Sequence, residues 1–215
     1  MRSRASIHFW NGFVKITGWL AQWVCFRTRI YYEDRSVQGR RIKGPAIIIS
    51  NHTSVFDYAV YLFVFFSRTV RFQMAELLFR KKFLGWLLPR LGGIYVDREG
   101  YDFGFVARSQ EILERGGVVG IFPESRLPRP GEERPLPFKV SAAYLALTTG
   151  VPVIPVVTDG SYFRRRRAHV LIGTPIDVRD YSDESRSQKD DLRIVSESLR
   201  QRIIELEKLL YEKSK

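Results

Sequence analysis

The sequence is poor in cysteine and histidine: its 215 residues include one cysteine, Cys25, and three histidines. A single thiol excludes a disulfide within the chain, which is consistent with a reducing compartment. So few thiols and imidazoles also argue against a structural zinc site, which uses four such ligands. We therefore expect neither a metal ion nor another resident cofactor.

Acidic residues are also scarce, since 23 Asp and Glu face 35 Lys and Arg, a formal net charge of +12. This imbalance implies an anionic partner, either nucleic acid or an anionic membrane surface. The four consecutive arginines at 164–167 are accompanied by no aromatic stacking platform and no recognised nucleic-acid motif. An anionic membrane explains both this run and the apolar N-terminus, so we expect a membrane surface and no nucleic acid as partner.

Residues 5–26 carry one formal charge, that of Lys15. Polar and small side chains recur every three or four residues in this segment and form one narrow helical stripe: His8, Asn11, Lys15, Gly18 and Gln22. Nearly all other positions are large and apolar, and three are tryptophans, which favour the membrane interface. We predict that residues 1–28 form a membrane-associating helix and that residues 29–215 form the folded domain.

The placement of this helix has several alternatives. A cleaved signal peptide is disfavoured because no small-residue cleavage site follows the apolar run. A single membrane span has a sufficient length, but it would bring Lys15 to the costly bilayer centre. Basic residues flank both ends and give no orientation bias. We favour a helix lying in one leaflet, with its polar stripe facing headgroups or the protein. Packing on the protein core is the remaining alternative.

The rest of the chain alternates between strand-like and helix-like segments. Short apolar runs typical of strands occur at 30–32, 46–49, 70–74, 94–96, 118–122, 153–157 and 168–172. Helix-like segments occur at 58–66, 101–115, 138–149 and 190–213. This order predicts an α/β fold: a single domain with a mixed, largely parallel central sheet flanked by helices. The basic, aromatic segment 75–91 is either a core helix with a solvated face or a second membrane-contacting surface.

His52 comes just after the predicted strand at 46–49, and Asp57 lies in the first turns of the following helix, which Thr53 or Ser54 can cap. Residues five apart on one straight helix point about 140° away from each other, so His52 and Asp57 meet only if His52 precedes the helix. A carboxylate bound to one imidazole nitrogen fixes the tautomer and leaves the other nitrogen as a base. The alternative is a buried histidine held by a carboxylate for structural reasons.

Three more blocks follow this motif: GIYVDR at 93–98, FPESR at 122–126 and VPVIPV at 151–156. With the four blocks in this order and spacing, residues 43–157 resemble the glycerolipid acyltransferase family, and within it the bacterial 1-acylglycerol-3-phosphate acyltransferases. The family usually has Glu-Gly-Thr-Arg in its third block, whereas here only Ser125 separates Glu124 from Arg126. The departure concerns the position of the arginine relative to the glutamate.

The resemblance implies that His52 removes the proton from the acceptor hydroxyl while Asp57 orients the imidazole. Arg98, in the second block, is then expected to bind the acceptor phosphate, since a guanidinium matches phosphate geometry. The resemblance also implies further substrate-binding residues, which are Glu124, Ser125, Arg126 and Lys139. For Lys139, a solvated lysine at the start of a helix is an equal alternative.

The resemblance further implies transfer of a fatty acyl chain from acyl-CoA or acyl-carrier protein to the free hydroxyl of lysophosphatidate, giving phosphatidate. No acyl-enzyme is needed, which agrees with the absence of a nucleophile elbow. The implied location is the cytoplasmic face of the cell membrane, with a monotopic or a single-span N-terminal helix. Two alternatives stay open: an acyltransferase for another lyso-lipid, and a catalytically silent lipid-binding protein of the membrane surface.

Overall fold

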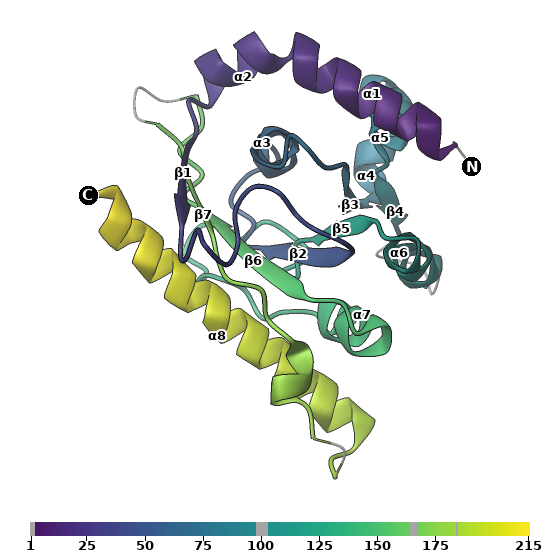
Figure 1. Ribbon diagram of the computed structural model, residues 1–215, viewed down its shortest axis with the longest axis vertical. Helices are drawn as coiled ribbons and strands as arrows, with labels where there is room; N and C mark the ends of the chain where they lie inside the picture. The colour runs from purple at the N-terminus through teal and green to yellow at the C-terminus, as the bar shows by residue number, and fades with distance from the viewer. Residues whose placement is uncertain (1–2, 98–102, 164–166, 184) are drawn as a thin grey trace.

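The apolar runs of the sequence become the strands of one sheet in the computed structural model, which describes residues 3–97, 103–163, 167–183 and 185–215 (Figure 1). Within these residues the sheet has seven strands in the order β1-β7-β6-β2-β5-β3-β4. The strands are β1 (Arg29–Tyr32), β2 (Ala46–Ser50), β3 (Val70–Ala75), β4 (Ile94–Val96), β5 (Val118–Ile121), β6 (Val153–Thr158) and β7 (His169–Ile172).

The strands β6 and β7 run antiparallel, and the other neighbouring pairs of the described sheet run parallel. The predicted mixed, largely parallel sheet is therefore confirmed. Along the central strand β2, Ile47 and Ile49 face one side of the sheet and Ile48 faces the other, and all three are buried. Burial on both faces explains why this strand is a continuous apolar run rather than an alternating one.

Helices cover both faces of the sheet. Helices α6, α7 and α8 pack on one face, while α3 and α5 pack on the other. Helices α1 and α2 form an outer layer that crosses α3 on the side away from the sheet (Figure 1). The helices are α1 (Arg4–Thr17), α2 (Trp19–Cys25), α3 (Asp57–Val64), α4 (Glu76–Phe79), α5 (Lys82–Leu91), α6 (Gly104–Glu114), α7 (Ser141–Thr149) and α8 (Gln188–Ser214), with a 3₁₀ turn, η1 (Val178–Tyr181).

The N-terminal segment, expected to form one helix within residues 1–28, instead forms two helices, α1 and α2, which meet at Gly18. The backbone N–H of Gly18 donates to the carbonyl group of Val14 at 2.8 Å and closes α1. A Cβ atom on Gly18 would lie 3.0 Å from the ring of Phe63 and 2.7 Å from that carbonyl oxygen. A larger residue at position 18 would therefore require the ring of Phe63 or the last turn of α1 to shift.

The polar stripe of α1 faces the protein, one of the two orientations expected for it. Asn11 is buried and donates to the last carbonyl group of α5 at 2.9 Å. Lys15 is 3% exposed, and its Nζ donates at 2.7–3.2 Å to three carbonyl groups, those of Phe65, Phe66 and Arg68. Of the two expected orientations, the structure therefore shows the one toward the protein, where the chain leaving α3 offers carbonyl groups that an ammonium satisfies.

The outer face of α1 and α2 is apolar and exposed to solvent. Its exposed large side chains, here called the outer apolar face, are Phe9, Phe13, Ile16, Trp19, Leu20, Trp23 and Val24. The ring of Trp10 contacts that of Trp86 edge to face at 5.3 Å, which extends this surface onto α5 and its exposed Phe83. Among the helices of the described residues, none combines the length and the apolarity that crossing a bilayer requires.

Candidate active site

His52 and Asp57 meet at the carboxyl end of β2, with His52 Nδ1 at 2.9 Å from Asp57 Oδ2. His52 lies just beyond the strand and Asp57 is the first residue of α3, as the five-residue spacing requires. Neither Thr53 nor Ser54 caps the helix with its hydroxyl, so that expectation is wrong. Instead the Asp57 carboxylate accepts the backbone N–H groups of Thr53 and Ser54 at 2.8 and 2.9 Å. A charged acceptor binds these amides more strongly than a hydroxyl does.

The Asp57 side chain is completely buried and saturated with donors. Besides the two amides and His52, it accepts the hydroxyl groups of Thr53 and Tyr162 at 2.9 and 2.8 Å. The groups around this carboxylate are donors, so Nδ1 is the nitrogen of His52 that donates to Asp57 and Nε2 points away from it. The His52 side chain is 16% exposed, which leaves the imidazole within reach of a substrate.

Glu124 holds the backbone of His52 in place. It follows β5, the strand beside β2, and its Oε1 accepts the N–H of His52 at 2.8 Å. Its Oε2 accepts the N–H of Leu136 at 2.8 Å, so the carboxylate joins the His52 loop to the proline-rich loop at 124–137. Burial raises the pKa of Glu124, while the two backbone hydrogen bonds and His52 act in the opposite direction.

Aromatic residues fix the plane of the imidazole. The ring of Phe122 stacks on His52 with centroids 4.3 Å apart and planes at 19°. On the other side of Asp57, the Tyr162 hydroxyl contacts both Asp57 and, at 3.0 Å, the hydroxyl of Thr158. Rotation of the imidazole is thereby limited by a ring on its face and by a hydrogen bond at Nδ1.

The other predicted substrate residues surround this site less closely. Ser125 adopts a left-handed conformation with φ of 60°, which turns the chain directly after Glu124. Arg126 is exposed and forms a two-pronged ion pair with Glu132 at 2.7 and 2.8 Å. Lys139 is exposed, and its backbone N–H donates to the carbonyl of Pro123 at 2.9 Å. Arg98 lies outside the described residues, and the substrate-binding roles of all these residues stay predictions.

Within residues 3–97, 103–163, 167–183 and 185–215, no group of three or more His, Cys, Asp and Glu side chains is placed to hold a metal ion. The described site offers the imidazole of His52 and the carboxylates of Asp57 and Glu124. A neutral imidazole backed by a buried carboxylate is suited to accept a proton from a hydroxyl group.

Comparison with known proteins agrees with this site. The family model described as Acyltransferase matches residues 16–159, which include the whole His52–Asp57 motif and Glu124. The chain belongs to the acyltransferase family. This confirms, at the level of the family, the resemblance carried by the four sequence blocks.

Several acyltransferases are similar to this one. It is 29% identical over 146 residues to the 1-acyl-sn-glycerol-3-phosphate acyltransferase of Bacillus subtilis, covering 66% of this chain and 70% of that protein. Identity to the Escherichia coli enzyme of the same name is 30% over 181 residues, or 79% of this chain and 71% of that protein. Human 1-acyl-sn-glycerol-3-phosphate acyltransferase beta is 28% identical over 75% of this chain and 59% of its own length.

The fold of this acyltransferase also matches a solved structure. The crystal structure of the 1-acyl-sn-glycerophosphate acyltransferase from Thermotoga maritima superimposes with a TM-score of 0.67, covering 96% of this chain and 84% of that one. Sequence identity between the two is 24%, so the match describes the fold alone.

Tyr162, Phe122 and the buried role of Glu124 are the parts of this acyltransferase site that sequence reasoning missed. Tyr162 lies 105 residues from Asp57, after β6, and no local pattern marks it. Phe122 lies in the third block but was assigned only to the strand. Glu124 was predicted to contact substrate, and its contacts within the protein depend on β5 lying beside β2.

Proposed function

We propose that this protein transfers a fatty acyl chain from acyl-CoA or acyl-carrier protein to the free hydroxyl of lysophosphatidate, giving phosphatidate. The observation that carries the proposal is the His52–Asp57 pair, with Nε2 of a partly exposed imidazole available as a base. The names of the similar enzymes supply the acceptor, and the acyl donor follows from the family resemblance.

In the proposed reaction, Nε2 of His52 takes the proton from the acceptor hydroxyl as its oxygen attacks the thioester carbonyl carbon. The tetrahedral intermediate then collapses, the carbon–sulfur bond breaks, and the leaving thiolate takes the proton from the imidazolium. Asp57 stabilises the imidazolium formed between these steps. The reaction needs no metal and no covalent enzyme intermediate.

Glu124 acts in this mechanism as a positioning residue, because it binds the backbone of His52 rather than the imidazole. Arg98 is proposed to bind the acceptor phosphate, with Ser125, Arg126 and Lys139 as further substrate contacts. A guanidinium–phosphate contact would fix the acceptor so that one hydroxyl approaches His52.

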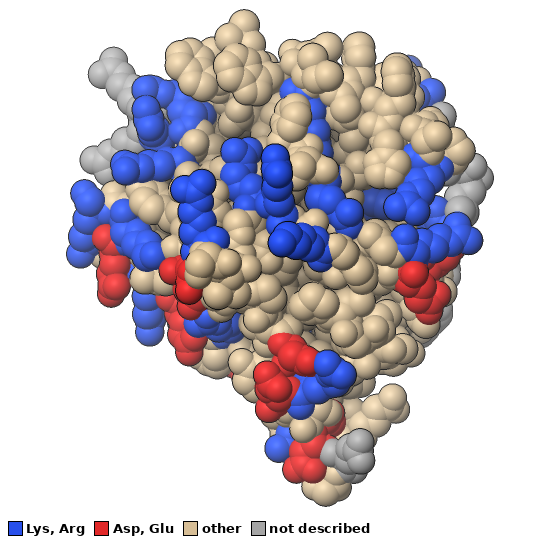
Figure 2. Space-filling model, viewed as in Figure 1, with Lys and Arg blue, Asp and Glu red and all other residues tan. Residues whose placement is uncertain are grey.

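We further propose that the outer apolar face lies in one leaflet at the cytoplasmic surface of the membrane. Trp19 and Trp23 of this face are residues that favour the membrane interface. Lys and Arg side chains form a belt below the apolar upper edge of the molecule in Figure 2. Such a belt is placed to contact anionic headgroups while the apolar side chains enter the acyl region.

The experiment that tests the reaction is an assay of thiol release from acyl-CoA with a panel of lyso-lipids presented in vesicles. Lysophosphatidate should support the fastest release, and the product should be identified as phosphatidate by mass spectrometry. Faster release with an acceptor that lacks a phosphate would assign the enzyme to another lyso-lipid. Absence of release with every acceptor and with both donor types would contradict catalysis.

A further inference from the structure

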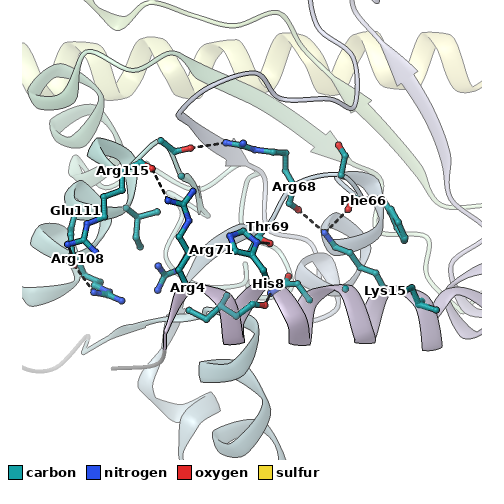
Figure 3. A pocket seen from close by; sticks show the side chains of 18 residues that line it. Arg4, His8, Lys15, Phe66, Arg68, Thr69, Arg71, Arg108, Glu111 and Arg115 are labelled. Carbon is teal, nitrogen blue, oxygen red and sulfur yellow. Dashed lines mark hydrogen bonds and ion pairs between the residues drawn. The ribbon is translucent and has the colours of Figure 1, made fainter.

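A cavity of about 370 Å³ lies beneath α1, away from His52. Its walls come from α1, from the segment leading into β3 and from α6, and Figure 3 shows their side chains converging on it. This space has the volume of about a dozen water molecules, enough for a phosphate and part of the group that it esterifies. We call it the basic pocket.

The basic pocket lies at the opposite edge of the sheet from the candidate active site. Residues 66–69 and 116–117 of its lining precede β3 and β5, whereas His52 follows the carboxyl end of β2. The three strands are parallel and in register at Ala46, Val70 and Val118. Five-residue β2 alone separates the two edges by about 16 Å, so one small ligand cannot occupy both sites.

Positive charge dominates the basic pocket. Its lysine and arginine side chains are Arg4, Lys15, Arg68, Arg71, Arg108 and Arg115. Among the described residues of the lining, the acidic side chain is Glu111 alone, and it is shared between Arg108 at 2.6 Å and Arg115 at 3.1 Å. The described lining therefore carries an excess of cations that an anion would balance.

The titration behaviour of two groups agrees with this excess. Burial and then the neighbouring Arg108 lower the pKa of Arg71 to about 10, with Glu111 acting in the opposite direction. Burial lowers the pKa of His8, and Arg4, Arg68, Lys15 and Arg71 lower it further. The Nδ1 of His8 lies 3.0 Å from the hydroxyl of Thr69, which holds the ring in the lining.

The opening of the basic pocket adjoins the outer apolar face. Ile16 belongs to both, since it lines the pocket and is 71% exposed. Phe66, also in the lining, is likewise exposed to solvent. A Cβ atom on Gly12 would meet no atom within 4 Å, so this helix position leaves the opening clear.

We propose that the basic pocket binds the phosphate group of an anionic ligand, carried either by a membrane lipid or by a soluble phosphate ester. Several guanidinium groups from three elements offer the charge-assisted hydrogen bonds that phosphate oxygens accept. The position of the opening beside the outer apolar face favours a lipid headgroup, which would reach the pocket from the leaflet. This site is separate from acyl transfer and does not depend on the function proposed above.

The test measures binding to the full-length protein without an acyl donor. Vesicles of phosphatidylcholine, with and without phosphatidate, are compared with inorganic phosphate in solution. The double variant Arg4→Gln/Arg71→Gln removes two cations of the pocket. The matched control Arg80→Gln/Lys81→Gln removes two exposed cations beside α5, next to the outer apolar face but outside the pocket.

The pocket variant should weaken binding to phosphatidate vesicles about tenfold more than the control does, because the control removes the same number of cations from the surface without touching the pocket. Equal losses in the two double variants would show a diffuse electrostatic attraction and overturn the proposal. Binding of inorganic phosphate that is lost only in the pocket variant would also support the site and identify a soluble ligand as sufficient. If neither phosphatidate vesicles nor inorganic phosphate bound to the basic pocket, the proposed phosphate site would be rejected.

A second pair of variants keeps the charges and changes only the space, in case the double variant does not fold. Gly12→Gln should obstruct the opening and weaken the same binding, whereas Gly12→Ala should leave it unchanged. Bound phosphate should also raise the pKa of His8, measured by NMR on its ring protons. If Gly12→Gln bound as strongly as the wild type, and if phosphate left the pKa of His8 unchanged, the ligand would bind outside the basic pocket.

Discussion

The carboxylate of Glu124 accepts the backbone N–H of His52 at 2.8 Å, although the two residues lie 72 positions apart. The same carboxylate accepts Leu136 N–H, so it is a bridge between two loops at the carboxyl edge of the sheet. A bridge of this kind fixes the height of the imidazole above the sheet, and the acyl transfer that we propose at His52 requires that height to be reproducible.

Glu124→Gln should lower turnover by about tenfold with little change in the Michaelis constants. An amide has one acceptor oxygen, so its nitrogen would face a backbone N–H and one loop would lose its partner. The free energy of unfolding should fall by about 1–3 kcal/mol. Steady-state kinetics and denaturant unfolding measure both effects, with Glu205→Gln at an exposed position of α8 as the control. A raised acceptor Michaelis constant at unchanged turnover would assign Glu124 to substrate contact instead.

His52→Ala should lower turnover by about a thousandfold, since a positioned base contributes about 10²–10⁴ to the rate. Asp57→Asn should lower it by about a hundredfold, because an amide cannot accept all the donors that surround Asp57. The chain offers a matched control in a second pair, where His169 Nδ1 lies 3.0 Å from Asp159. His169→Ala should retain turnover. Comparable losses in His52→Ala and His169→Ala would point to destabilisation rather than base catalysis.

Phe13→Gln/Trp23→Gln should weaken binding to vesicles by about tenfold or more, because both side chains belong to the outer apolar face. Deletion of residues 1–28 is a poorer test, since it would uncover the surface that Asn11 and Lys15 contact. The control is Tyr211→Gln, an equally exposed aromatic on α8. Vesicle co-sedimentation measures binding, and unaltered binding in the double variant would contradict the proposed membrane contact.

The stability of the protein should rise as the pH increases from 8 to 9.5. Burial lowers the pKa of Lys15 to about 8, well below its value in an unfolded chain. Over this window the unfolded chain therefore binds more protons than the folded one, and the free energy of unfolding increases with pH by up to about 1 kcal/mol per unit. Denaturant unfolding at a series of pH values measures the slope, which should flatten in Lys15→Met. If the free energy of unfolding of the wild type instead decreased over this pH range, Lys15 would remain charged in the folded protein.

The pattern of apolar runs was sufficient to predict that the domain contains a sheet and that most of its strands run parallel. Strands buried on both faces leave continuous apolar segments, and the helices between them require parallel connections. The His52–Asp57 contact was predictable for a similar reason, because both residues belong to one strand–helix junction. The order of the four blocks was sufficient to identify the family.

The tertiary structure alone decided the contacts that join distant segments. In the sheet β2 lies between β5 and β6, which brings Glu124 to His52 and Tyr162 to Asp57. Local periodicity carries no information on this strand order. The outer layer is a second example. The helical period of residues 8–22 predicted a polar stripe, but it could not predict which surface that stripe contacts. In the folded chain this stripe faces α3 and α5, the helix breaks at Gly18, and the basic pocket lies between α1, β3 and α6. These outcomes depend on the shapes and carbonyl groups of surfaces that exist only once the chain is folded.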